Sequence, residues 1–226
     1  MYQYDLFSNE TTEYPATAQI GIPTGPKSTD SSTASALRMP RVVGIAGLAG
    51  AGKDTLAAHL VEKYGFVRRA LADPMKELLN KFFDWDMMDW DSRIWKESPI
   101  LGQYRAFGQE YSPRQLAQWL GTEVGRSTFG SDCWVRLLDD YINEKAIGRS
   151  VVVPDIRFAN EARYIKHELG GIVVEVRRAN APQVAAHVSE RGLPTGYADV
   201  VIHNNGTIDE FLKKAVYDIS EAYERC

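Results

Sequence analysis

The sequence has few cysteines and no long apolar run. The two cysteines among 226 residues, Cys133 and Cys226, are too few for a disulfide framework, which favours a reducing compartment. No apolar run approaches the roughly 18–20 residues that a membrane-spanning helix requires. The N-terminus also lacks the basic segment and apolar block of a secretory signal. These absences predict a cytoplasmic protein with no membrane partner.

An excess of positive charge is also missing. The formal net charge is −4, whereas proteins that bind a nucleic acid polymer usually present a basic face. A nucleic acid polymer is therefore not an expected partner, although a small phosphorylated ligand needs only a local cluster of cations. The four histidines and two cysteines show no metal-ligand spacing, which argues against a structural zinc site.

The chain divides into a polar N-terminal part and a longer part with regular patterning. Residues 1–38 are rich in Ser, Thr, Pro and Gly and predict a flexible tail, followed by one domain over 39–226. Apolar segments that predict buried strands lie at 41–46, 66–71, 150–155, 171–176 and 199–203. Because helical patterns separate about five such strands, we expect a parallel sheet covered on both faces, an α/β three-layer domain.

A helical insertion is expected between about residues 73 and 148. Its clearest element is "SPRQLAQWLGTEVGR", in which Ser112 and Gln115 form a capping box. At α-helical spacing, Leu116, Trp119, Leu120 and Val124 share one apolar face, so Trp119 is expected to be structural. A second capping box, Thr207 with Glu210, precedes the last amphipathic helix.

A glycine-rich loop follows the first predicted strand. In "AGLAGAGKDT", Gly47, Gly52 and Lys53 match the phosphate-loop spacing G-x-x-x-x-G-K-[ST], but Asp54 follows the lysine and Thr55 comes one place late. Strand, loop and helix succeed one another in the order that lets backbone N–H groups and a helix N-terminus surround phosphates. The loop therefore predicts nucleotide binding.

Asp54 allows two interpretations. A carboxylate in the first helical turn is stabilised by the helix dipole, by about 0.3–1 kcal/mol. Next to a polyphosphate the same group would be repelled unless Mg²⁺ or an arginine lay between them. Asp54 is thus either a plain helix charge or a group that faces the acceptor and the metal. The sequence alone does not distinguish between these two interpretations.

Four segments in order resemble the bacteriophage-type deoxynucleoside monophosphate kinases, within the wider P-loop nucleoside monophosphate kinase group. They are "GLAGAGKDT", "SPRQLAQWLGTEVGR…DCWV", "VVVPDIRFANEA" and "HVSE…ADVVIHNNGTIDEF". The resemblance spans about residues 41–224. In such kinases a loop ending in G-K-x-T is normal, so Asp54–Thr55 fits the pattern.

The resemblance implies a P-loop kinase fold with a helical acceptor-binding insertion and a lid at about 178–198. The implied reaction moves the γ-phosphoryl group of ATP, with Mg²⁺, to a deoxynucleoside monophosphate and gives ADP and the diphosphate. The partners are then ATP and a nucleoside monophosphate, with a homodimer left open. A phage-encoded enzyme would work in the host cytoplasm.

Several residues are candidates for binding ATP, the phosphoryl donor, and its Mg²⁺ ion. Asp155 and Arg157 come just beyond the end of a buried strand, where α/β sheets place ligands, although a surface ion pair is the plain alternative. Mg²⁺ is expected at Thr55 and Asp155, in part through water. The expected ATP-binding residues are Gly47, Gly50, Gly52, Lys53, Asp54 and Thr55. The expected catalytic residues are Lys53, Asp54, Arg157 and Arg178.

Further candidates belong to the acceptor and the lid. The expected acceptor-binding residues are Arg69, Lys76, Arg114, Gln118, Arg126 and Trp134, although a charged helix start or solvent-facing helix side would look the same. Arg177, Arg178 and Arg191 are lid arginines, of which one or two are expected to reach the site. The roles of His187 and Glu190 stay open.

Two other functions fit parts of the sequence. A kinase for another small acceptor, such as dephospho-coenzyme A, would use the same loop. A non-catalytic P-loop module that binds ATP for regulation would also need it. A guanine-nucleotide switch is not expected, because no N-K-x-D motif follows the loop.

Overall fold

The computed structural model describes residues 37–85, 90, 92–99, 105–106, 109–179 and 192–226. Nearly all of the predicted tail lies outside these residues. Most of the predicted lid does as well, including His187, Glu190 and Arg191.

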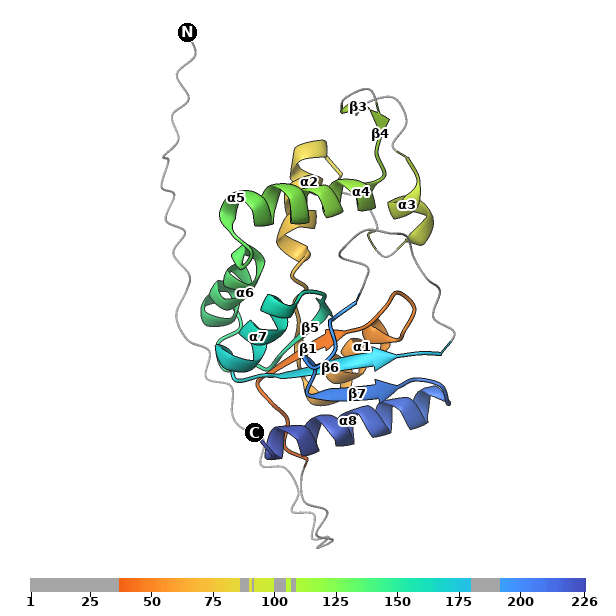
Figure 1. The fold of residues 1–226 in the computed structure, drawn as a ribbon, viewed down its shortest axis with the longest axis vertical. Coiled ribbons are helices and arrows are strands. Elements are labelled where there is room, and N and C mark those ends of the chain that lie inside the picture. The colour runs from red at the N-terminus through yellow and green to blue at the C-terminus, as the bar shows by residue number, and fades with distance from the viewer. Residues whose placement is uncertain (1–36, 86–89, 91, 100–104, 107–108, 180–191) are drawn as a thin grey trace, which may run out of the picture. The chain divides into compact units, whose positions relative to one another are not determined.

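A five-stranded sheet forms the centre of the domain (Figure 1). Its strand order is β2-β5-β1-β6-β7, and every neighbouring pair is parallel. Each predicted strand segment overlaps one of these strands, so the α/β class and the parallel sheet are confirmed. The strands are β1 (Val42–Ala46), β2 (Val67–Arg68), β5 (Val151–Ile156), β6 (Ile172–Arg177) and β7 (Val200–His203).

Helices cover both faces of the sheet and give it two hydrophobic cores. On one face, α1 (Lys53–Tyr64) and α8 (Ile208–Glu224) bury side chains such as Leu60 and Ile219 against Val43. On the other face, α6 (Cys133–Glu144) and α7 (Ala159–His167) pack against alternate residues of the same strands. Continuous Val and Ile runs are typical of strands buried on both faces.

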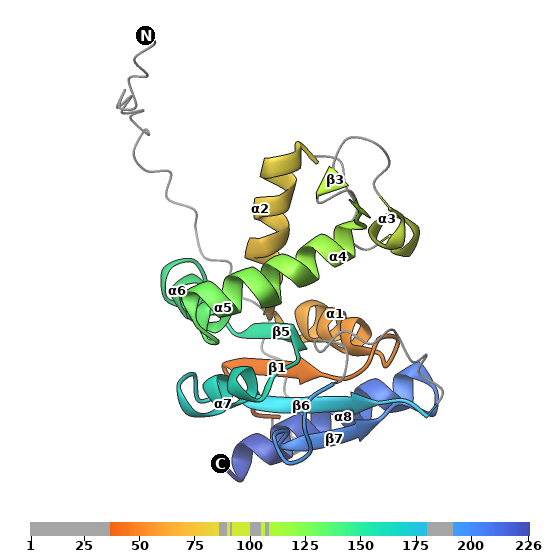
Figure 2. The same cartoon turned by 45° about the horizontal axis from the view of Figure 1, so that its top comes forward.

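The segment between α2 and α6 lies to one side of the sheet (Figures 1 and 2). It starts with α2 (Asp73–Phe83) and leads through α3 (Arg93–Glu97) to a short antiparallel pair, β3 (Arg105–Ala106) and β4 (Gln109–Glu110). It continues through α4 (Pro113–Gln118), η1 (Trp119–Arg126) and α5 (Ser127–Phe129). The α6 helix then returns the chain to the sheet.

Element η1 is a π-helix, which corrects one prediction. The capping box of Ser112 and Gln115 is present, but the α-helix that it starts ends at Gln118. In a π-helix the hydrogen bonds run from i to i+5, so α-helical spacing no longer tells which residues share a face. Trp119 is 50% exposed instead of structural, and Gly121 and Gly125 are the buried residues of η1.

Candidate active site

The phosphate loop connects β1 to α1 in a conformation that glycine alone adopts without strain. Gly47, Gly50 and Gly52 have φ values of 140°, 73° and 109°. A Cβ atom on Gly47 would collide with the backbone carbonyl oxygen of Val176. The loop therefore lies directly against β6, and α1 begins at Lys53 with its first N–H groups at the loop.

A pocket of about 250 Å³, the phosphate-loop pocket, opens beside this loop. Lys53 Nζ donates a hydrogen bond to the carbonyl oxygen of Leu48 at 2.8 Å, so the lysine lies over its own loop. Asp54 is exposed and lies 4.0 Å from Arg68. Lys53, Asp54 and Arg68 all line the pocket, whereas Thr55 is exposed and is not among its described lining residues.

A second pocket of about 190 Å³, the insertion pocket, lies between α2, η1 and the end of β5. Its walls are mostly apolar, with a small number of polar groups, as is usual for ligand sites. The residues that line this pocket alone are Leu71, Met75, Ala117, Gln118, Gly121, Thr122, Arg126, Trp134, Phe158 and Glu161.

The two pockets adjoin through a common wall. Four side chains of this wall, from α2, α3, α4 and the end of β5, are cationic. Such a cluster can hold anionic groups of two ligands close together. The described residues that line both pockets are Ala72, Lys76, Trp90, Lys96, Arg114, Asp155 and Arg157.

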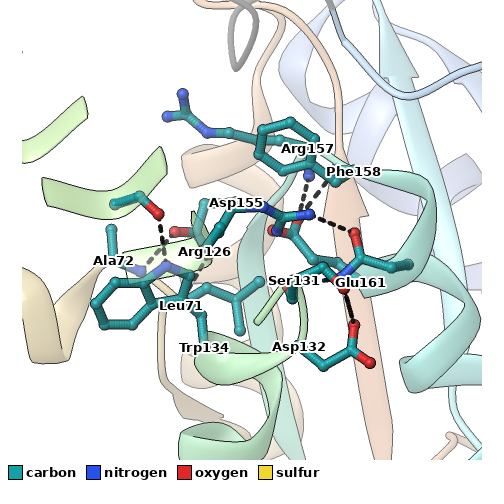
Figure 3. A network of polar contacts seen from close by, with 12 residues as sticks. Leu71, Ala72, Arg126, Ser131, Asp132, Trp134, Asp155, Arg157, Phe158 and Glu161 are labelled. Carbon is teal, nitrogen blue, oxygen red and sulfur yellow. Dashed lines mark hydrogen bonds and ion pairs between the residues drawn. The ribbon is translucent and has the colours of Figure 1, made fainter. Parts of the chain in front are cut away.

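Asp155 fixes the end of β5 to the start of α2 (Figure 3). Its two carboxylate oxygens accept hydrogen bonds from the backbone N–H groups of Leu71 and Ala72, at 2.8 and 3.0 Å. The residue belongs to β5 itself rather than to the loop beyond it. Arg157 is the first residue after β5, and both Asp155 and Arg157 line the two pockets at this end of the strand.

Arg126 lies at the edge of the insertion pocket, held by residues that start α7. Its Nη1 donates to Glu161 Oε1 at 3.1 Å, its Nη2 donates to Asn160 Oδ1 at 2.7 Å, and its guanidinium lies 4.0 Å from the Phe158 ring centre. Burial raises the pKa of Glu161 to about 7, although the N–H groups of Arg157 and Phe158 and the charge of Arg126 act to lower it.

The structure brings most of the expected acceptor-binding residues together. Lys76, Arg114, Gln118, Arg126 and Trp134 all line the insertion pocket. The indole Nε1 of Trp134 donates to the carbonyl oxygen of Gly121 at 2.8 Å, which anchors the ring to η1. Trp134 therefore forms a fixed wall of the pocket.

Arg69 is not brought to either pocket. It donates to Glu77 at 2.7 Å and lies 4.8 Å from the ring centre of Tyr141. Its neighbour Arg68 lines the phosphate-loop pocket instead. Consecutive side chains along an extended segment point to opposite sides, so a shift of one residue exchanges a site residue for a structural one.

Arg178 lies apart from the common wall. It lines a neighbouring pocket of about 270 Å³ that shares Gly47, Leu48 and Gly192 with the phosphate-loop pocket. Arg177, in the same pocket, is paired with Glu175 at 2.8 Å.

Sequence reasoning missed several lining residues, chiefly Lys96, Thr122, Glu161 and the pocket role of Trp90. Trp90 is held by a hydrogen bond from its Nε1 to Asn80 Oδ1 at 3.0 Å, and the Lys76 ammonium lies 5.7 Å from its ring centre. Rings of Trp85 and Trp95 pack edge-on nearby. The dense tryptophans of this segment were the available signal, although no periodicity showed which one reaches the site.

The carboxylates of the phosphate-loop pocket fit a Mg²⁺ ion carried by a nucleotide. Asp54 and Asp155 line it, and the described residues contain no group of three His, Cys, Asp or Glu side chains that could hold a metal alone. Mg²⁺ typically binds through one or two carboxylates together with phosphates and water.

Within the described part of the chain, no helix has the length and apolar character needed to span a membrane.

Comparisons with known proteins agree with the four-segment resemblance. The family model for deoxynucleotide monophosphate kinase matches residues 94–215. A putative deoxynucleotide monophosphate kinase of Acanthamoeba polyphaga mimivirus is 31% identical over 80% of this chain and 97% of its own length. The deoxynucleotide monophosphate kinase of Enterobacteria phage T4 is 24% identical over 77% of this chain and 96% of its own length.

A third relative matches a shorter part of the chain. The deoxynucleoside-5'-monophosphate kinase of Escherichia phage T5 is 28% identical over 49% of this chain and 46% of its own length. The family model covers more than half of the chain, and the mimivirus relative aligns over almost its full length. The chain therefore belongs to the deoxynucleotide monophosphate kinase family.

Proposed function

We propose that the protein transfers the γ-phosphoryl group of ATP to a deoxynucleoside monophosphate, which gives ADP and a deoxynucleoside diphosphate. One observation carries the proposal: a phosphate-loop pocket and a mostly apolar pocket share a wall that contains Lys76, Lys96, Arg114 and Arg157. Two anionic substrates would meet at this wall. The names of the relatives support the same activity.

The phosphate-loop pocket is the proposed ATP site. Gly47, Gly50 and Gly52 let the backbone N–H groups approach the phosphates closely, and the N-terminus of α1 favours negative charge. Lys53 would exchange the carbonyl oxygen of Leu48 for phosphate oxygens.

The insertion pocket is the proposed site of the acceptor. Its apolar side, with Met75, Trp134 and Phe158, suits a nucleobase, and Gln118 and Thr122 can hydrogen-bond to base edges. The acceptor phosphate would then lie at the common wall. Arg69 has no part in this proposal, because it lines neither pocket.

In the reaction, a phosphate oxygen of the acceptor attacks the γ-phosphorus of ATP, and the bond to the β–γ bridging oxygen breaks. Catalysis of this step consists mainly of alignment and cationic stabilisation of the transferred group. Lys53 and Arg157 are the proposed cations, with Arg178 as a third from the neighbouring pocket.

Mg²⁺ on the nucleotide would neutralise charge on the β- and γ-phosphates. Asp54 and Asp155 are the proposed carboxylates toward it. Asp155 would act through water, because both of its oxygens already accept backbone hydrogen bonds. Thr55 has the weaker support of the two sequence-based metal candidates, since it is exposed and outside the described pocket lining.

A coupled assay of ADP release tests the proposal. Full-length protein with ATP and Mg²⁺ is given each deoxynucleoside monophosphate, each ribonucleoside monophosphate and dephospho-coenzyme A. Turnover should be fastest with one or more deoxynucleoside monophosphates. Turnover only with dephospho-coenzyme A, or none with a folded protein that binds ATP, would reject the proposal in favour of one of the two alternatives. Lys53→Ala is the control for site-dependent turnover.

A further inference from the structure

Glu161 is a buried carboxylate at the wall of the insertion pocket. Its side chain is 6% exposed, and it lies in the first turn of α7. Its Oε2 accepts hydrogen bonds from the backbone N–H groups of Arg157 and Phe158, at 2.8 and 3.0 Å. Its other oxygen remains for Arg126. One carboxylate thus joins the turn after β5 to η1.

The guanidinium of Arg126 has a second anchor from the same helix start. Asn160 Oδ1 accepts from it at 2.7 Å, while the amide nitrogen of Asn160 donates to the carbonyl oxygen of Ser131 and to Asp132 Oδ1, at 2.9 and 2.8 Å. Figure 3 shows this chain of contacts running from Arg126 to the residues before α6. Arg126 therefore reaches the pocket in a fixed orientation.

Helix capping does not require this burial. Glu210 accepts the backbone N–H of Thr207 at the start of α8, in the same third helical position, and it is exposed. Burying a carboxylate is costly unless its hydrogen bonds are worth more than the lost hydration. At Glu161 the additional bond is the one to Arg126 at the pocket edge.

We propose that Glu161 is a positioning residue for acceptor binding: it orients the Arg126 guanidinium toward the deoxynucleoside monophosphate in the insertion pocket. The inference rests on the proposed function, because it assumes that this pocket holds the acceptor. Asn160 assists by holding the second nitrogen of the same guanidinium.

Glu161→Gln separates the positioning role from the capping role. The glutamine keeps one oxygen for the N–H groups of Arg157 and Phe158, but it places an NH₂ group against Arg126, so that two donors face each other. We expect the KM for the acceptor to rise about tenfold, the size of one lost hydrogen bond to a charged group. The KM for ATP should stay near the wild-type value, and kcat should change less than the acceptor KM.

Glu210→Gln is the matched control, because it alters a capping glutamate away from both pockets. It should leave both KM values near wild type. Asn160→Ala removes the second anchor of Arg126 together with the hydrogen bonds to Ser131 and Asp132, and leaves Glu161 in place. It should raise the acceptor KM by a smaller factor than Glu161→Gln. If Glu161→Gln does not fold, Glu161→Asp takes its place: its shorter carboxylate lies farther from Arg126, and an unchanged acceptor KM in that variant would overturn the proposal.

An unchanged acceptor KM in a folded Glu161→Gln protein would overturn the proposal. Equal rises in both KM values would also overturn it, since that is the signature of a purely structural residue. Failure of the proposed function looks different: the wild-type protein itself would then turn over no deoxynucleoside monophosphate. Titration calorimetry of acceptor binding to both proteins gives the same comparison without turnover.

Discussion

The side-chain amide of Asn204 donates a hydrogen bond to the carbonyl oxygen of Ala51, with 2.9 Å between nitrogen and oxygen. Asn204 is the first residue after β7, and Ala51 belongs to the phosphate loop, so the segment that follows the last strand supports the loop directly. A Cβ atom on Gly52 would collide with this amide nitrogen. The loop conformation thus depends on a residue far away in the sequence.

Asn204→Ala should therefore weaken ATP binding more than acceptor binding. We expect a loss of about 1 kcal/mol in the free energy of unfolding, typical for one hydrogen bond, and a KM increase confined to ATP. Asn205→Ala is the control, because Asn205 Oδ1 accepts from the N–H of Ala179 instead. Initial rates with each substrate varied in turn provide the test, and an equal effect on both KM values would contradict the support role.

Gly47→Ala should abolish detectable ATP turnover. The position has a φ of 140°, and the new methyl group would collide with backbone that belongs to β6. Gly65→Ala is the control: φ is 70° there, but nothing lies within 4 Å of the added Cβ. That variant should cost about 1 kcal/mol of stability and keep its activity. Active Gly47→Ala protein would mean that the loop can move away from β6.

Asp54→Asn decides between the two interpretations of this carboxylate. Asp54 is 85% exposed at its side chain and lies 4.0 Å from Arg68, so its ion pair contributes little to stability. If Asp54 faces the metal, kcat should fall about tenfold or more while ATP affinity changes little. Activity equal to wild type, with a small loss in thermal midpoint, would identify a plain helix charge.

The free energy of unfolding should change with pH as the Glu161 carboxyl group titrates. Its pKa is raised from 4.5 to about 7 in the folded protein, so folding takes up a proton between these values. The associated stability is present below pH 4.5 and is lost as pH rises through about 7. A shift of this size corresponds to about 3 kcal/mol.

Urea unfolding of wild type and Glu161→Gln at pH 5 and pH 8 measures this effect. Because glutamine does not titrate, the variant should gain stability relative to wild type at the higher pH. Stability curves that stay parallel between these pH values would show that the Glu161 carboxyl keeps an ordinary pKa in the folded protein.

The features that the sequence predicted well are local ones. The buried strands show as runs of Val and Ile, and the capping boxes at Ser112 and Thr207 depend on a pair of residues three apart. Asp155 and Arg157 were found because parallel strands end at one edge of a sheet. In each case a short stretch of chain contains the whole signal.

The features that were missed depend on contacts between distant segments. The π-helix at η1 packs Gly125 against the ring of Trp134, which no periodicity within 119–126 reveals. Glu161 lies in a polar helix start and looks like a solvent-exposed residue until Arg126 is brought to it. The sequence indicated Arg69, whereas Arg68, the last residue of the two-residue strand β2, lines the phosphate-loop pocket.

The common wall between the pockets limits how the enzyme can be redesigned. A substitution at Lys76 or Arg114 touches both pockets. Under the proposed assignment of the pockets, a library that varies them selects for donor and acceptor properties at once. Met75, Gln118 and Thr122 line the insertion pocket alone. Directed evolution toward modified nucleotides, such as monomers for polymerase chemistry, can therefore begin with these three positions while ATP use is held constant.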